Sequence, residues 1–177
     1  MACEPPTGLT FNIAGMQRSG TFYLSSLLQR NFGLAQNNPD SPKDGQDTYK
    51  HCMRPFALTC PTFVIYKPVY HWLESVALRN HCFSHIIENT HKYDEARYIQ
   101  TTRDMAIGKA PSLARLTNIY RQFYENWVLD VPGNHQRQLF VIRYSDLLTE
   151  SSRVETLHKI HRRFGFMKTD ACVNVDW

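Results

Sequence analysis

The chain has 177 residues and 42% hydrophobic content, which predicts a single globular domain over residues 1–177 with enough apolar side chains for a core. The formal net charge is +4 and the lysines and arginines are scattered, so the sequence argues against a nucleic-acid-binding protein and weakly favours anionic ligands. The N-terminus lacks a signal-peptide pattern, and no apolar run approaches the length of about 18 residues that is needed to span a bilayer. The five cysteines include no CxxC pair. We therefore expect a soluble cytoplasmic protein with no membrane partner, no disulfide framework and no zinc ribbon.

The first predicted unit is a strand, a loop and a helix. The segment LTFNIAG, residues 9–15, is predicted to be a buried strand that ends at a glycine. The segment TFYLSSLLQRNFG, residues 21–33, has apolar side chains at helical spacing and a final glycine, which predicts a helix that stops there. The polar stretch 34–50, punctuated by Pro, Gly and Asp, is expected to form a surface excursion near the mouth of the loop.

The rest of the chain continues this alternation of strands and helices. Further strands are predicted at 61–67 and 137–144, and helices at 69–83, 112–130, 145–150 and 152–166. Strands separated by helices predict an α/β fold in three layers, P-loop-like, with a central parallel sheet and helices on both faces. Ligands of such folds bind at the carboxyl ends of the strands.

Residues 15–20, GMQRSG, are here called the glycine loop. Backbone amides in a glycine turn that leads into a helix lack intrahelical partners, and together with the helix dipole they favour an anion. The two glycines have the spacing of an ATP-binding P-loop. However, Thr21 and Phe22 stand where the lysine and the Mg²⁺-binding hydroxyl of GK[ST] are required. A cation stands earlier instead, at Arg18, so we expect the loop to bind a phosphate or a similar oxyanion without a metal.

The stretch RSGTFYL, residues 18–24, resembles the 5′-phosphosulfate loop of the sulfotransferases that use 3′-phosphoadenosine 5′-phosphosulfate (PAPS). That family has Lys or Arg, then Ser-Gly-Thr, then Thr or Ser and an aromatic residue or Leu. Phe22 departs from the pattern, which has a second hydroxyl there. The resemblance implies that PAPS is the co-substrate and that Tyr23 either stacks on adenine or packs in the first helical turn. The implied phosphosulfate contacts come from Arg18, Ser19, Gly20, Thr21 and Phe22.

A second match to this family follows the next predicted strand, in VIYKPVYHWLES. Lys67 and, eight positions later, Ser75 stand where the family binds the 3′-phosphate of the cofactor. Pro68 is one place earlier than the proline of many members, and Trp72 at helical spacing is interpreted as a core residue. The resemblance therefore implies a second phosphate contact made by Lys67 and Ser75.

A third match consists of IYRQFYENWVLD, residues 119–130, followed by RQLFVIRYSDLL, residues 137–148. It is similar to an aromatic helix of the family that contains a Trp and is followed by a segment ending in Tyr-Glu-Asp-Leu-Leu. Tyr144, Asp146 and Leu147 agree with it, and Ser145 replaces the glutamate. We interpret the segment as scaffold in which Arg143 and Tyr144 fix the sheet to a helix.

Sulfuryl transfer needs a base for the proton of the acceptor, and a histidine suits that role near neutral pH. The segment TYKHC resembles a Trp-Lys-His element of some small sulfotransferases, which makes His51 the candidate base. Two alternatives stay open: His51 is an exposed loop histidine, or another residue such as Asp47 or Glu74 serves as the base. Lys50 could help to bind the sulfuryl oxygens.

Two other histidine clusters are not interpreted as metal sites. His81 and His85 share a helix face near Cys82, but the glutamate of HExxH and a clear third ligand are lacking. The segment around His158 and His161 is a basic helix interpreted as a solvated face.

Two alternative functions stay open at this stage. One is a P-loop nucleotide kinase, which the missing GK[ST] argues against. The other is a catalytically inactive nucleotide-binding or interaction module, because cytosolic sulfotransferases cover the 3′-phosphate with a late basic, glycine-containing segment that the final DACVNVDW does not resemble. The acceptor is expected to be a small molecule or a carbohydrate, held by residues 34–50 and 84–111.

Overall fold

The computed structural model of the protein describes residues 9–16, 18–37, 51, 55, 58–77, 113–131, 133 and 136–167. Within these residues four strands form one parallel sheet in the order β2-β1-β3-β4. The strands are β1 (Thr10–Ala14), β2 (Ala35–Gln36), β3 (Thr62–Tyr66) and β4 (Leu139–Arg143). The predicted α/β class and the parallel sheet are confirmed.

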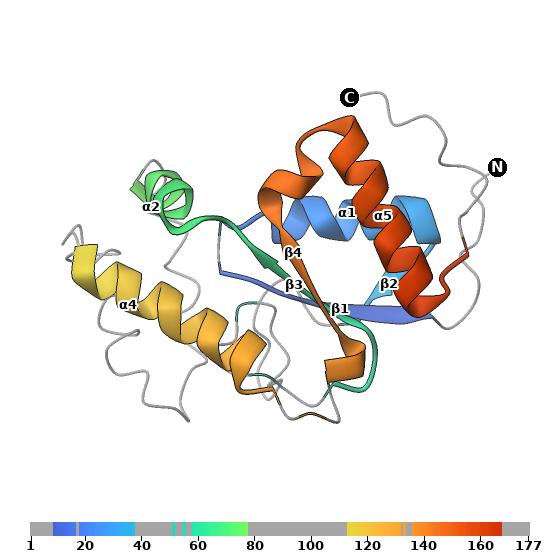
Figure 1. The fold of residues 1–177 in the computed structure, drawn as a ribbon, viewed down its shortest axis with the longest axis horizontal. Coiled ribbons are helices and arrows are strands. Elements are labelled where there is room, and N and C mark those ends of the chain that lie inside the picture. The colour runs from blue at the N-terminus through green and yellow to red at the C-terminus, as the bar shows by residue number, and fades with distance from the viewer. Residues whose placement is uncertain are drawn as a thin grey trace.

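Helices cover both faces of this sheet (Figure 1). Helices α1 (Thr21–Phe32) and α5 (Glu150–Phe164) lie on one side, and α2 (Val69–Ala77) and α4 (Leu113–Tyr124) on the other. Helix α4 continues directly into a π-helical turn, η2 (Glu125–Leu129), and two short 3₁₀ helices, η3 (Gln136–Gln138) and η4 (Tyr144–Leu147), flank β4. Helix α1 therefore connects β1 to β2 along one face, and α2 and α4, which stand between β3 and β4 in the chain, cover the other face.

The two faces of the sheet carry separate hydrophobic cores, because successive side chains of a strand point to opposite sides. Phe11 and Ile13 of β1 pack with α1 and α5, whereas Ala14 packs with α2 and α4. Strand β3 divides in the same way, with Phe63 and Ile65 on the first side and Val64 on the second. The buried side chains beside α2 and α4 include three large aromatic residues: Trp72, Phe123 and Trp127. Trp72 is thus a core residue, as its spacing indicates.

Several element boundaries differ from those predicted. Strand β2 lies inside the stretch 34–50 that was expected to be an irregular excursion, and it pairs with the start of β1. The helix predicted at 145–150 is the 3₁₀ helix η4 instead. Helix α5 begins two residues earlier than predicted, at Glu150, because the Thr149 side chain caps it by accepting a hydrogen bond from the Ser152 amide.

Candidate functional site

The glycine loop joins the carboxyl end of β1 to the first turn of α1. Gly20 has φ 97° and is the N-cap of α1, and Arg18 has φ 68°, which is uncommon for a residue with a Cβ atom. Gly15 is required for another reason: a Cβ there would lie 2.6 Å from Ser19 Oγ and 2.9 Å from the Ile65 carbonyl oxygen. The backbone conformation of the loop therefore requires glycine at position 20, and the close packing around the loop requires it at position 15.

Ser19 stabilises the glycine loop through two hydrogen bonds inside it. Its hydroxyl donates to the Met16 carbonyl at 2.6 Å, its amide donates to the same oxygen at 3.1 Å, and the residue is buried. Within the described residues no side chain caps α1 at Gly20. The helix therefore begins with amide donors that lack intrahelical partners, the usual condition for binding an anion. Thr21 is buried beside these amides, whereas Phe22 is 72% exposed.

Lys67 and Ser75, paired by the family resemblance, lie together in the structure. Lys67 follows β3 and its Nζ donates to Ser75 Oγ at 3.0 Å; the Ser75 hydroxyl in turn donates to the His71 carbonyl at 2.7 Å within α2. The same ammonium lies 4.5 Å from the centre of the Tyr144 ring, and a Cβ added to Gly20 would meet that ring. The Tyr144 side chain thus connects Lys67 to the end of the glycine loop.

The pKa of Lys67 reflects its closeness to the glycine loop. Burial lowers the pKa of the Lys67 ammonium, the positive charge of Arg18 lowers it further, and Glu74 opposes this shift. Two cations that repel each other in this way are stabilised by an anion bound between them.

His51 lies at the loop rather than at an exposed position. Its side chain is buried and its Nδ1 is 2.5 Å from the Gly15 carbonyl oxygen. A carbonyl oxygen only accepts, so Nδ1 carries a proton here, and in a neutral ring with this tautomer Nε2 is the basic nitrogen. That tautomer is the one a general base requires.

Two tyrosines of α4 hold the strand ends beside the loop, and they were not singled out from the sequence. Tyr124 Oη donates to the Ile65 carbonyl at 3.0 Å and accepts from the Met16 amide at 3.4 Å, and Tyr120 Oη donates to the Lys67 carbonyl at 2.5 Å. Burial raises the pKa of Tyr120 to about 12 and raises that of Tyr124 further. Their spacing of four residues on one helix face was the available signal.

The other aromatic residues of the candidate site have structural contacts. Tyr23 donates to the Leu147 carbonyl at 3.3 Å and accepts from Arg153 at 2.7 Å, which joins α1 to η4 and α5. These contacts suit the packing role, and stacking on adenine stays a prediction. Tyr144 meets the start of α1 as expected, whereas Arg143 Nε donates to Tyr66 Oη at 3.0 Å on the neighbouring strand.

Several predicted residues lie outside the described residues. They are Asp47, Lys50, the His81, Cys82 and His85 cluster, the predicted acceptor segment 84–111, residues 38–50 of the other predicted acceptor segment, and the final residues 168–177. Among the residues that are described, no group of three or more His, Cys, Asp and Glu side chains is placed to hold a metal ion. Cys60 is a free thiol. In the same part of the chain no helix is both long and apolar enough to cross a membrane.

Comparison with models of protein families, with curated proteins and with solved structures found no match to this chain. The function must therefore be argued from the site itself.

Proposed function

We propose that the protein transfers a sulfuryl group from PAPS to a hydroxyl or amine acceptor. The observation that carries this proposal is the 3.0 Å contact between Lys67 and Ser75, connected through the Tyr144 ring to the glycine loop. PAPS has a phosphate at each end of its ribose, so it needs two separate anion sites. The glycine loop with Arg18 is proposed to hold the 5′-phosphosulfate, and Lys67 with Ser75 the 3′-phosphate.

The reaction follows from these roles. The acceptor oxygen or nitrogen attacks sulfur in line, and the bond from sulfur to the 5′-phosphate oxygen breaks. His51 takes the acceptor proton at Nε2, supported by the contact of Nδ1 with the Gly15 carbonyl. Arg18 and the N-terminus of α1 stabilise the charge that develops on the leaving oxygen. The products are a sulfated acceptor and adenosine 3′,5′-bisphosphate.

A nucleotide kinase is the second candidate function, because the loop between β1 and α1 has the glycine spacing of a P-loop. The missing lysine and hydroxyl of GK[ST] argue against it. An inactive nucleotide-binding module is the third, and it would keep the binding residues without turnover.

Calorimetric titration separates these three functions. We expect adenosine 3′,5′-bisphosphate to bind more tightly than ATP with Mg²⁺; the reverse order would favour a kinase, and no binding of either would favour an interaction role. Labelled PAPS with panels of phenol, carbohydrate, peptide and lipid acceptors then tests turnover. Bisphosphate binding without transfer to any acceptor would favour the inactive module.

A further inference from the structure

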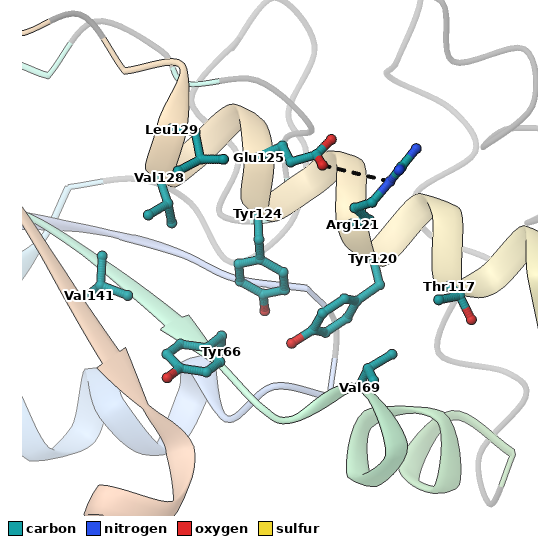
Figure 2. A pocket seen from close by; sticks show the side chains of 10 residues that line it. All are labelled: Tyr66, Val69, Thr117, Tyr120, Arg121, Tyr124, Glu125, Val128, Leu129 and Val141. Atoms are coloured by element: carbon teal, nitrogen blue, oxygen red, sulfur yellow. Dashed lines mark ion pairs between the residues drawn. The ribbon is translucent and has the colours of Figure 1, made fainter.

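An open cleft of about 620 Å³ lies between α4 and the carboxyl half of the sheet. Figure 2 shows Tyr120 and Tyr124 extending from α4 toward Tyr66 at the end of β3, with Val141 of β4 at one end and Val69 of α2 near the other. The rings of Tyr120 and Tyr124 are 4.7 Å apart, and those of Tyr66 and Tyr124 are 6.1 Å apart. The cleft thus has a continuous aromatic wall and a size typical of small-molecule sites, which range over about 300–1,000 Å³.

The oxygen of each of the three phenol groups in this wall already has a hydrogen-bond partner. Tyr120 and Tyr124 donate to the carbonyls of Lys67 and Ile65, and Tyr66 accepts from Arg143. These residues therefore line the cleft mainly with the carbon atoms of their rings. Val128 and Val141 extend the same apolar surface.

The charged side chains that line the cleft balance each other. The charged lining residues, Arg121 and Glu125, lie 3.7 Å apart as an ion pair at the rim (Figure 2). Burial raises the pKa of Tyr120 and of Tyr124, so both phenols stay neutral at physiological pH. Two cations lie beside the lining residue Tyr66: Lys67 follows it in the chain, and the Arg143 guanidinium lies 5.7 Å from the centre of its ring. Both disfavour a cationic ligand. Among the lining residues a charged ligand would find no unpaired charge to offset its lost hydration.

Some of the apolar side chains that line the cleft are exposed to solvent. Leu129 is 71% exposed and Val141, in the middle of a strand, is 40% exposed. Aromatic walls favour flat rings, which stack or meet edge to face with tyrosine and bury a large area. We infer that the cleft is a binding site for an uncharged, planar aromatic molecule. The inference does not depend on the proposed sulfuryl transfer, because none of its lining residues is assigned to PAPS.

The neutral dye N-phenyl-1-naphthylamine tests this site, since its fluorescence rises in apolar surroundings. We expect saturable binding of one dye per chain to the full protein, unchanged by adenosine 3′,5′-bisphosphate. Displacement of the dye by the bisphosphate would place it in the nucleotide site and overturn the inference.

The variant Val141→Phe keeps strand propensity and apolar character but fills part of the cleft. We expect about tenfold weaker dye binding, because a filled cleft excludes the ring. Val154→Phe on α5, where the valine is 44% exposed on the opposite side of the sheet, is the matched control and should leave binding unchanged. A flat adhesive surface would instead bind the dye more tightly after Val141→Phe, and that result would overturn the inference.

A second filling variant guards against misfolding of the strand. Thr117 lies on the exposed face of α4 and lines the cleft, so Thr117→Phe should preserve the fold and also weaken dye binding about tenfold. Circular dichroism checks the fold of each variant. Equal dye affinity of folded Thr117→Phe and the parent protein would contradict a site in this cleft.

Discussion

Lys67 donates a 3.0 Å hydrogen bond to Ser75, eight residues later, and so joins the end of β3 to α2. Charge-assisted hydrogen bonds to phosphate contribute about 1.5–3 kcal/mol each, so Lys67→Ala should weaken binding of adenosine 3′,5′-bisphosphate roughly ten- to a hundredfold. Titration calorimetry measures the change. Lys159→Ala is the control, because that ammonium pairs with Glu155 at 2.8 Å on α5. Unchanged affinity for Lys67→Ala would remove this lysine from the site.

The contact between His51 and the Gly15 carbonyl leads to a prediction on turnover. A base acts on the acceptor rather than on the cofactor, so His51→Ala should lower the rate on the order of 10²–10⁴-fold with bisphosphate affinity nearly unchanged. Steady-state rates with labelled PAPS and a good acceptor check this. His158→Ala, at an exposed position of α5, should keep full activity. Full turnover by His51→Ala would instead direct attention to Asp47 or Glu74.

In the proposed transfer, Arg18 should stabilise the transition state more than it stabilises the bound ground state. The charge that it meets grows as the leaving oxygen departs, so Arg18→Ala should reduce kcat by a larger factor than it reduces bisphosphate affinity. Because the loop lacks the hydroxyl of GK[ST], EDTA should leave the transfer rate unchanged. Reversible loss of activity in EDTA would contradict the metal-free mechanism.

The close approach of backbone at Gly15 predicts a loss of stability on adding one methyl group. Gly15→Ala brings Cβ to 2.9 Å from the Ile65 carbonyl oxygen, which cannot move without disturbing β3, and overpacking of this kind costs about 1–3 kcal/mol. Thermal unfolding measures the difference. Gly133→Ala is the matched control: its Cβ would meet nothing within 4 Å, so its melting temperature should equal or exceed that of the parent.

The tyrosines of α4 predict a loss of stability at high pH. In the unfolded chain they ionise near 10, whereas burial holds the pKa of Tyr120 at about 12 and that of Tyr124 higher. Above pH 10 the unfolded state therefore binds fewer protons than the folded state, and the free energy of unfolding falls as pH rises. Tyr124→Phe should make this fall shallower in denaturant titrations from pH 8 to 11. The control is Tyr70→Phe, at a ring that is 81% exposed.

The fold was predictable where the apolar pattern is long. Strands β1 and β3 lie in continuous apolar runs, which predict buried strands; their side chains in the core include Phe11, Ile13, Phe63 and Ile65. Strand β4 also lies in an apolar run. Strand β2 was not predictable, because it consists of Ala35 and Gln36 and exists only through pairing with β1. The π-helical turn after Tyr124 has no sequence signal of its own that we recognise.

The candidate site was predictable only in part. The family resemblance paired Lys67 with Ser75 because both lie in one short motif, eight positions apart. The hydrogen bonds of Tyr120 and Tyr124 to the Lys67 and Ile65 carbonyls span more than fifty residues and depend on how α4 packs against the sheet. The spacing of four residues places both tyrosines on one helix face, but tertiary packing decides which carbonyls they reach.

The parallel sheet also determines the order in which the site can assemble. Asn12 and Thr62, in neighbouring strands, are 50 residues apart along the chain, and Tyr66 and Arg143 are 77 apart. Chain entropy must be lost before such distant segments gain contacts, so sheets of this kind form slowly. The glycine loop and α1 are local in sequence, but Lys67, Tyr124 and Tyr144 reach the loop only after β3, α4 and β4 have docked. Nascent chains that end before residue 144 should therefore lack the proposed nucleotide site.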